Sequence, residues 1–172
     1  MAIVGGSISA GAGAVDAHSW TEWMQDFLEL KFDKTRLSIH NGAVPGTLSS
    51  YMSVCHNVHV PVQADIIFVE YSLNDEHAHG PAFDNPTRRP FERLLRKLMT
   101  YPNKPALVIY NAYSWFSYMN HLGRFYASAE RQFYEFATYY QLPMISVKAG
   151  IWRLMYQGGL GGACERGQRG GA

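Results

Sequence analysis

The chain has 172 residues, of which 47% are hydrophobic, and a nearly even charge balance of 15 Lys and Arg against 14 Asp and Glu, which suits one globular domain with one core. Its one dense basic run, TRRPFERLLRK at 87–97, is typical of the solvated face of a helix, so the composition argues against nucleic-acid binding. No apolar stretch approaches the roughly 20 residues of a membrane span, and the first residues lack the basic start and long apolar core of a signal peptide.

The cysteine pattern indicates neither a metal centre nor a disulfide framework. Cys55 and Cys164 lie in different surroundings and show no CxxC or Cys/His spacing. We therefore expect no metal and no cofactor.

The first half of the chain predicts alternating strands and helices. The apolar run 2–5 predicts a strand, and 19–32 predicts a helix that begins with a capping box of Ser19 and Glu22. Next come a predicted strand over 35–40, the turn-rich NGAVPGT and a short helix at about 48–57. The near-continuous apolar run over 64–71 then predicts a strand with helices on both faces. The side chains at helical spacing in 19–32 are Trp20, Trp23, Met24, Phe27, Leu28 and Phe32.

The second half continues the alternation. A helix is predicted at about 90–100, with Pro90 in its first turn and Pro102 just past its end. The series ends with a strand at 106–110, a helix at 122–140, a strand at 143–147 and a short helix at about 149–156. The expected core stripes of the two longer helices are Phe91, Leu94, Leu95, Leu98 and Met99, then Phe125, Ala129, Phe133, Phe136 and Tyr140.

This alternation predicts an α/β fold with a mostly parallel sheet between helices, because parallel neighbours need crossovers of helical length. Such folds bind ligands beyond the carboxyl ends of their strands. We expect one domain over 1–157 and a disordered tail over 158–172, where GGLGGACERGQRGGA offers almost no large apolar residue.

Three loops at strand ends carry the candidate chemistry: GGSIS at 5–9, NGAVPGT at 41–47 and EYSLND at 70–75. Each alone is typical of a turn or a helix cap. If the first strand lies between the second and third, the loops converge, and a serine hydroxyl, a glycine amide and an asparagine carboxamide meet at one point. That combination is a nucleophile with donors for an oxyanion.

The three stretches resemble the first three sequence blocks of the SGNH-hydrolase superfamily, which includes the GDSL lipases and esterases. The resemblance is sharp over 3–75 and architectural over 76–157. It implies a three-layer α/β/α sandwich with a parallel five-stranded, flavodoxin-like sheet. It also implies that Ser7 is the nucleophile, and that Gly46 and Asn74 supply oxyanion donors. The expected activity is hydrolysis of an acyl ester or O-acetyl group on a small molecule or carbohydrate.

Two features depart from the family pattern. Gly6 stands where the family usually has aspartate before the nucleophile. The family's late Asp-x-x-His block is also missing, since no histidine follows His121 and no aspartate follows Asp84. A serine without an adjacent base is a weak nucleophile, so we expect impaired catalysis and hypothesise a truncated or mispredicted version of a longer esterase-like protein.

The remaining histidines offer weaker alternatives. His77 and His79 follow Asn74 closely and could act as a base, or bind a metal with Asp75 and Glu76, although a solvated loop is the simpler interpretation. The others are expected to be structural, on the surface or along the pocket: His18, His40, His56 and His59.

The aromatic loop 111–118 has two interpretations. It could form a wall for a sugar or acyl group, or an apolar surface covered by a C-terminal segment. Both interpretations remain open.

Two other functions stay open. A non-catalytic carbohydrate- or acyl-binding relative fits nearly as well as an enzyme. A nucleotide-binding module fits less well, because Gly11 and Gly13 lack a third glycine and no P-loop Lys-Ser/Thr follows. The GxSxG elbow of α/β-hydrolases is also missing around Ser7.

Overall fold

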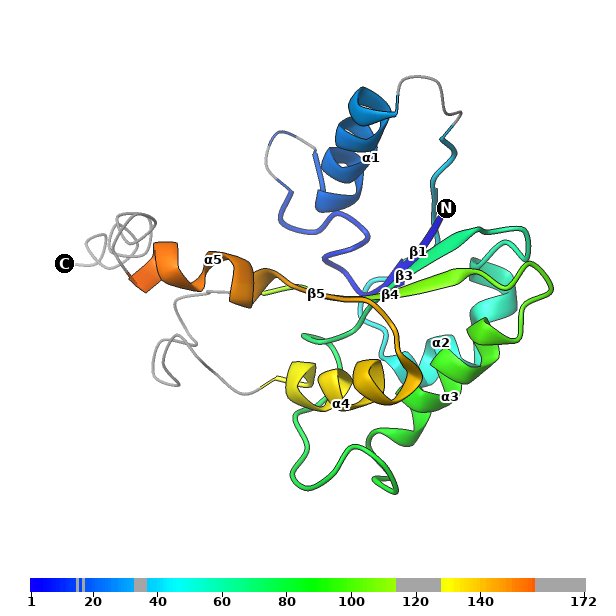
Figure 1. The fold of residues 1–172 in the computed structure, drawn as a ribbon, viewed down its shortest axis with the longest axis vertical. Coiled ribbons are helices and arrows are strands. Elements are labelled where there is room, and N and C mark those ends of the chain that lie inside the picture. Colours follow the sequence, from blue (N-terminus) through cyan, green and yellow to red (C-terminus); the bar gives the residue numbers. More distant parts are fainter. Residues whose placement is uncertain (15, 17, 33–36, 114–127, 157–172) are drawn as a thin grey trace.

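The computed structural model describes residues 1–14, 16, 18–32, 37–113 and 128–156. Five parallel strands form one sheet in the order β2-β1-β3-β4-β5, with helices on both faces (Figure 1). This is the flavodoxin-like strand order, so the predicted fold class is confirmed. The elements are β1 Ala2–Gly5, α1 Trp20–Lys31, β2 His40–Asn41, α2 Ser49–His59, β3 Ile66–Glu70, α3 Arg89–Met99, β4 Ala106–Asn111, α4 Glu130–Tyr140, β5 Met144–Ser146 and α5 Val147–Tyr156.

The main core lies between the sheet and α2, α3 and α4, which share one side of the sheet (Figure 1). Alternate residues of β3 and β4 enter this core, among them Ile67, Val69 and Ile109, all fully buried. The rings of Phe91 on α3 and Phe133 on α4 stack with centroids 3.6 Å apart. The described residues of the two predicted stripes are therefore in the core or, for Met99 and Tyr140, partly buried against it.

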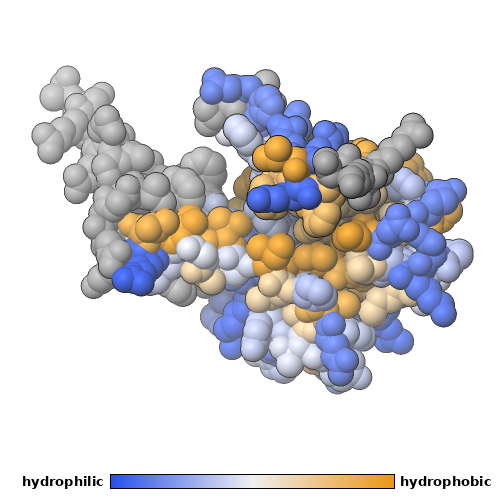
Figure 2. Space-filling view, turned by 45° about the horizontal axis from the view of Figure 1, so that its top comes forward, coloured by the Kyte–Doolittle hydropathy of each residue, from blue (hydrophilic) through white to orange (hydrophobic). Residues whose placement is uncertain are grey.

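The opposite face of the sheet carries α1 (Figure 1). Trp20 stacks on Tyr110 of β4 with ring centroids 4.1 Å apart and meets Phe68 of β3 edge-on at 6.3 Å. The rest of the predicted stripe of α1 is largely uncovered: Trp23 is 62% exposed and Phe27 is 56% exposed. In Figure 2, hydrophobic residues form a broad patch on this side of the molecule.

The start of α1 follows the predicted capping arrangement. The Glu22 carboxylate accepts the backbone N–H of Ser19 at 2.6 Å and the Ser19 hydroxyl at 2.8 Å. These bonds satisfy donors that would otherwise be unpaired at the helix start. They also lower the pKa of Glu22, because both donors favour its charged form.

Two predicted boundaries are wrong. The strand expected over 35–40 is observed as β2 at His40–Asn41, which pairs with Ala2 and Ile3 of β1, and the described residues 37–39 lie before it. Residues 35–36 lie outside the described residues. The helix expected over 122–140 begins at Glu130, whose N–H is accepted by the Ser128 hydroxyl at 3.4 Å, while the Ala129 N–H donates to the Ser72 carbonyl. The first part of that predicted helix, with Phe125, lies outside the described residues.

Several other expectations cannot be tested on the described residues. The predicted glycine-rich tail, with Cys164, and most of the aromatic loop lie outside them. The domain boundary at 157 stays a prediction for the same reason. Within the described part of the chain, no helix is long and apolar enough to cross a bilayer.

Candidate active site

The carboxyl edge of the sheet brings the three predicted loops together. β1 pairs with β2 on one side and β3 on the other, all in parallel, so the loops that follow these strands leave the same edge. The Val44 N–H donates to the Gly5 carbonyl at 3.0 Å, which ties the loop after β2 to the end of β1.

Ser7 lies in a tight turn directly after β1. The Gly6 carbonyl accepts the Ala10 N–H at 3.1 Å, and the Ser7 carbonyl accepts the Ala12 N–H at 2.8 Å. The Ser7 side chain is half-buried, and within the described ranges its hydroxyl has no hydrogen-bond partner. A fixed backbone therefore presents a hydroxyl that is available to a ligand.

Asn74 packs against this turn from the loop after β3. Its own N–H donates to the Tyr71 carbonyl at 3.1 Å, and its carboxamide occupies the space that a Cβ at Gly6 would need. Any residue larger than glycine at position 6 would displace this side chain. The Asn74 carboxamide therefore lies directly beside the residue that precedes Ser7.

Gly46 lies at the exposed tip of the loop after β2. Its φ of +72° suits glycine, and nothing lies within 4 Å of where a Cβ would be. The turn is closed by the Thr47 hydroxyl, which donates to the Val44 carbonyl at 2.8 Å. The backbone N–H of Gly46 has no hydrogen-bond partner among the described residues, so it can serve a ligand.

A buried carboxyl, Glu70, lies under this edge, and sequence reasoning did not single it out. Glu70 ends β3, is fully buried, and accepts the Ser9 hydroxyl at 3.0 Å. Asn41 of β2 donates from its side chain to the Ser9 carbonyl at 2.8 Å. Burial raises the pKa of Glu70 to about 7. The available signal was an acid near the end of the largely apolar run ADIIFVEY, which also contains Asp65 near its start.

A second buried carboxyl, Asp75, fixes the Asn74 loop to α2. It accepts the N–H of Ser49 at 2.9 Å and the hydroxyl of Ser49 at 2.6 Å. The wholly buried guanidinium of Arg88 lies 3.5 Å away and also donates to Gln132 at 2.7 Å. Burial raises the pKa of Asp75, and the Ser49 and Arg88 contacts oppose that change.

The histidines of the described residues do not complete a catalytic set. None of them hydrogen-bonds Ser7; His56 bonds the Tyr101 hydroxyl at 2.8 Å and His59 bonds the Tyr51 hydroxyl at 2.9 Å. The rings of His77 and His79 lie 5.1 Å apart, yet the described part of the chain holds no cluster of three potential metal ligands. His56 and His59 therefore have structural partners, and no base is assigned.

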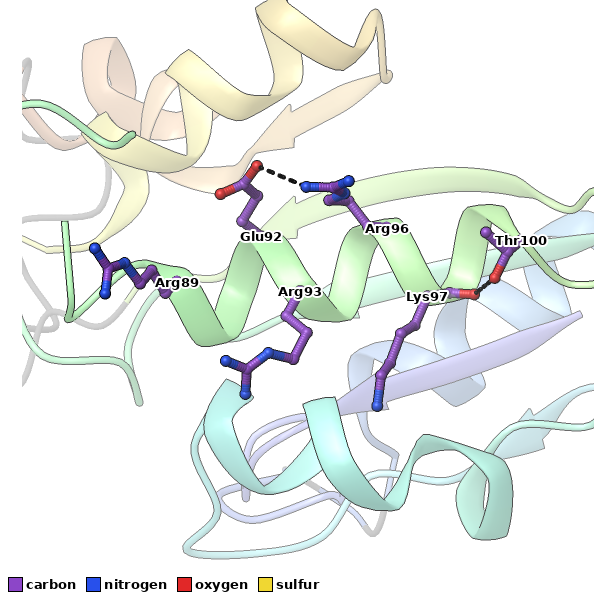
Figure 3. Close-up of a pocket in the computed structure, with 6 residues that line it drawn as sticks. All are labelled: Arg89, Glu92, Arg93, Arg96, Lys97 and Thr100. Atoms are coloured by element: carbon purple, nitrogen blue, oxygen red, sulfur yellow. Dashed lines mark hydrogen bonds and ion pairs between the residues drawn. The ribbon is translucent and has the colours of Figure 1, made fainter. Parts of the chain in front are cut away.

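Among the described residues, one surface hollow lies beside the candidate site and another lies along α3. One, of about 490 Å³, lies beside the turn after β1 and the start of α1, and its lining includes Ala10, Ser19 and Asn41. The other, of about 420 Å³, lies along α3. Figure 3 shows that Arg93 and Lys97 of the second hollow point toward α2, and Lys97 donates to the Ser53 carbonyl at 2.8 Å. The second hollow is lined mainly by cationic side chains.

Comparison with known proteins finds solved structures with a similar fold. No protein-family model matches the sequence, and no curated protein matches it. A two-domain esterase active on acetylated mannans matches with a TM-score of 0.75 and 21% identity, over 92% of this chain and 39% of that one. A lipase/acylhydrolase from Enterococcus faecalis matches with a TM-score of 0.60 and 16% identity, over 87% of this chain and 77% of that one.

An acetyl xylan esterase from Geobacillus stearothermophilus gives a TM-score of 0.59 at 13% identity, over 84% of this chain and 74% of that one. The chain therefore has the α/β fold of solved esterases and lipases. It spans 39% of the length of the mannan esterase.

Proposed function

We propose that the chain is an ester hydrolase of the SGNH type that works by acyl transfer to Ser7. The observation that carries the proposal is the packing of the Asn74 carboxamide on Gly6, next to a hydroxyl with no partner of its own among the described residues. Asn74 comes from a different strand than Ser7, so this contact is a product of the tertiary fold rather than of a local turn.

The proposed chemistry follows from these groups. The Ser7 oxygen attacks the ester carbonyl, its proton passes to a base, and the negative charge on the carbonyl oxygen meets the amides of Ser7 and Gly46 and the carboxamide of Asn74. Collapse breaks the bond to the alcohol, which leaves with a proton. Water then attacks the acyl group, releases the acid and restores the Ser7 hydroxyl.

The base is the missing element of this proposal. No histidine follows His121 in the sequence, and none of the described histidines bonds Ser7. Loss of the base costs several orders of magnitude in rate, so the proposed activity of this chain is weak. An O-acetyl group on a polysaccharide is the proposed substrate class, because two of the similar structures are esterases of acetylated mannan and xylan.

Labelling with a fluorophosphonate probe tests the proposal directly. We expect the probe to label the chain, to label Ser38→Ala equally, and to fail with Ser7→Ala, because Ser38 is exposed and its carbonyl bonds Met1, at the end of β1 opposite to Ser7. Slow hydrolysis of p-nitrophenyl acetate should disappear in Ser7→Ala alone. Labelling that persists in Ser7→Ala would remove Ser7 from the proposal.

A non-catalytic carbohydrate- or acyl-binding protein is the second candidate, favoured by the lack of a histidine bonded to Ser7 in the described residues. It predicts no labelling in any variant together with binding of acetylated mannan or xylan oligosaccharides in calorimetry. We also propose that the chain binds no nucleic acid, and thermal stabilisation by NAD or ATP would indicate a nucleotide-binding module instead.

A further inference from the structure

The buried carboxylate of Glu70 lies beneath the turn that carries Ser7. Glu70 pairs laterally with Gly5, and it accepts the Ser9 hydroxyl at 3.0 Å. The Gly6 backbone N–H also favours the charged form of this carboxylate and opposes the rise of its pKa. The Glu70 side chain therefore bonds Ser9 and acts electrostatically on Gly6, on the two sides of Ser7.

The turn also packs tightly on this floor. A Cβ added at Gly5 would lie 2.6 Å from the Ser9 hydroxyl and 2.8 Å from the Glu70 carbonyl, which is too close for any side chain. Asn41 fixes the far end of the turn through the Ser9 carbonyl. The turn thus has little freedom to move unless its bonds to Glu70 change.

A buried acid is a costly way to fill this space if packing were its only role. Moving a carboxylate out of water is unfavourable, and an apolar residue of similar volume usually gives a more stable fold. Phe68 and Trp20 on the same face are apolar, and no cation among the described residues acts on the Glu70 pKa to offset that cost. Its hydrogen bonds to the Ser7 turn are its evident contribution.

We propose that Glu70 is a positioning residue, whose carboxylate holds the Gly6–Ser9 turn and so sets the place of the Ser7 hydroxyl and amide. The part of this inference that concerns reactivity rests on the proposed function of Ser7. The part that concerns the turn does not.

The charge on Glu70 decides how well it can do this. The ionised group accepts the Ser9 hydroxyl and attracts the Gly6 N–H, whereas the protonated group carries an O–H of its own. The second carboxyl oxygen, Oε1, has no hydrogen-bond partner among the described residues. Burial raises the pKa of Glu70 to about 7, Ser9 and Gly6 oppose that rise, and the nearby charge of Asp75 adds to it. Tyr71 and Tyr110 also interact electrostatically with Glu70. Burial raises the pKa of both tyrosines, so both are neutral phenols near pH 7.

The amide resonance of Gly6, followed by NMR against pH, tests the bond itself. We expect it to titrate with a midpoint near 7 in the unmodified chain and to stay constant in Glu70→Gln. Ser9→Ala keeps the charge but removes one donor, so its midpoint should move above 7; this variant carries the test if Glu70→Gln does not fold. A Gly6 resonance that does not titrate, or that titrates equally in Glu70→Gln, overturns the inference.

Labelling of Ser7 by the fluorophosphonate tests whether the charge of Glu70 affects the reactivity of Ser7. We compare the labelling rate of the unmodified chain with that of Glu70→Gln. Their ratio should rise about tenfold between about pH 5.5 and about pH 8.5, because ionisation of Glu70 turns its bond from Ser9 into a charge-assisted one. A ratio that is independent of pH overturns the link between Glu70 and Ser7. Absence of labelling in every variant would count against the proposed function instead, and the Gly6 titration would then decide the role of Glu70 alone.

Discussion

Single atoms decide whether the three loops can form one site. At Gly6 the space for a Cβ is already filled by the Asn74 carboxamide, and at Gly5 it is filled by Ser9. These glycines are therefore needed for close approach of neighbouring groups.

Gly6→Ala should weaken the site more than the fold. The added methyl meets the end of a side chain that can rotate, so we expect Asn74 to turn away at a stability cost of about 1 kcal/mol. Ser7 labelling should fall about tenfold or more, as expected when one oxyanion donor is lost. Gly150→Ala is the matched control, because its Cβ meets nothing within 4 Å. Unchanged labelling in Gly6→Ala would mean that Asn74 is not a donor.

Gly42→Ala should instead weaken the fold. Its Cβ would overlap the backbone carbonyl of His59, which cannot rotate away as a side chain can. We expect a loss of about 2 kcal/mol in the free energy of unfolding, measured by urea denaturation. A loss below about 0.5 kcal/mol would show that the end of α2 yields easily.

Among the helices, α1 and α3 have similar apolar patterns in the sequence but differ in how much of that pattern is buried. The stripe of α3 is core, whereas most of the stripe of α1 is exposed, because α3 packs between α2 and α4 while α1 meets the sheet through Trp20. Periodicity identifies the apolar side of a helix, but neighbours decide how much of it is covered.

Paired truncations measure this difference. Phe91→Ala removes a fully buried ring stacked on Phe133 and should cost about 4 kcal/mol. Trp23→Ala removes a ring that is 62% exposed and should cost about 0.5 kcal/mol. Thermal or urea unfolding of both variants checks the prediction, and a similar loss in the two would mean that the exposed face of α1 is covered in solution.

The Asp75 network couples the Asn74 loop to the start of α2 and to Arg88. Asp75→Asn should cost about 3 kcal/mol, because it leaves a wholly buried guanidinium without its anion. Combining it with Arg88→Met should recover part of that loss, since the stranded charge is removed as well. A double-mutant cycle by urea denaturation measures the coupling, and additive losses would contradict it.

At the scale of the whole molecule, Glu70 makes stability depend on pH. Its ordinary pKa is 4.5 and its folded value is about 7, so between these values the folded chain binds more protons than the unfolded chain. Stability contributed by the protonated group is therefore lost as the pH rises through this range. The full difference is about 3 kcal/mol at most.

Glu70→Gln isolates this contribution. The difference in free energy of unfolding between Glu70→Gln and the unmodified chain should grow by about 3 kcal/mol from about pH 5 to about pH 8, with the variant the more stable at high pH. Asp75 contributes with the same sign in both chains and cancels in the difference. A difference that stays constant with pH would place the Glu70 pKa near its ordinary value.

The candidate site was predictable in part. Ser7, Gly46 and Asn74 follow strand ends, and that position is readable from the sequence pattern. Glu70 was not singled out, because a strand pattern does not reveal that its last acid lies under a turn from another strand. The start of β2 was predicted too early for a related reason, because the strand is defined by its pairing with Ala2 and Ile3 of β1, which the local pattern does not show.

The sequence by itself determined the order of strands and helices, the parallel class of the sheet and the residues at the strand ends, because periodicity and turn chemistry are local properties. Only the tertiary structure decided that Asn74 fills the space beside Gly6, that Glu70 lies buried beneath Ser9, and that α1 leaves its aromatic side chains uncovered. These depend on which distant segments meet, and burial and contact between distant segments are properties of the packed chain.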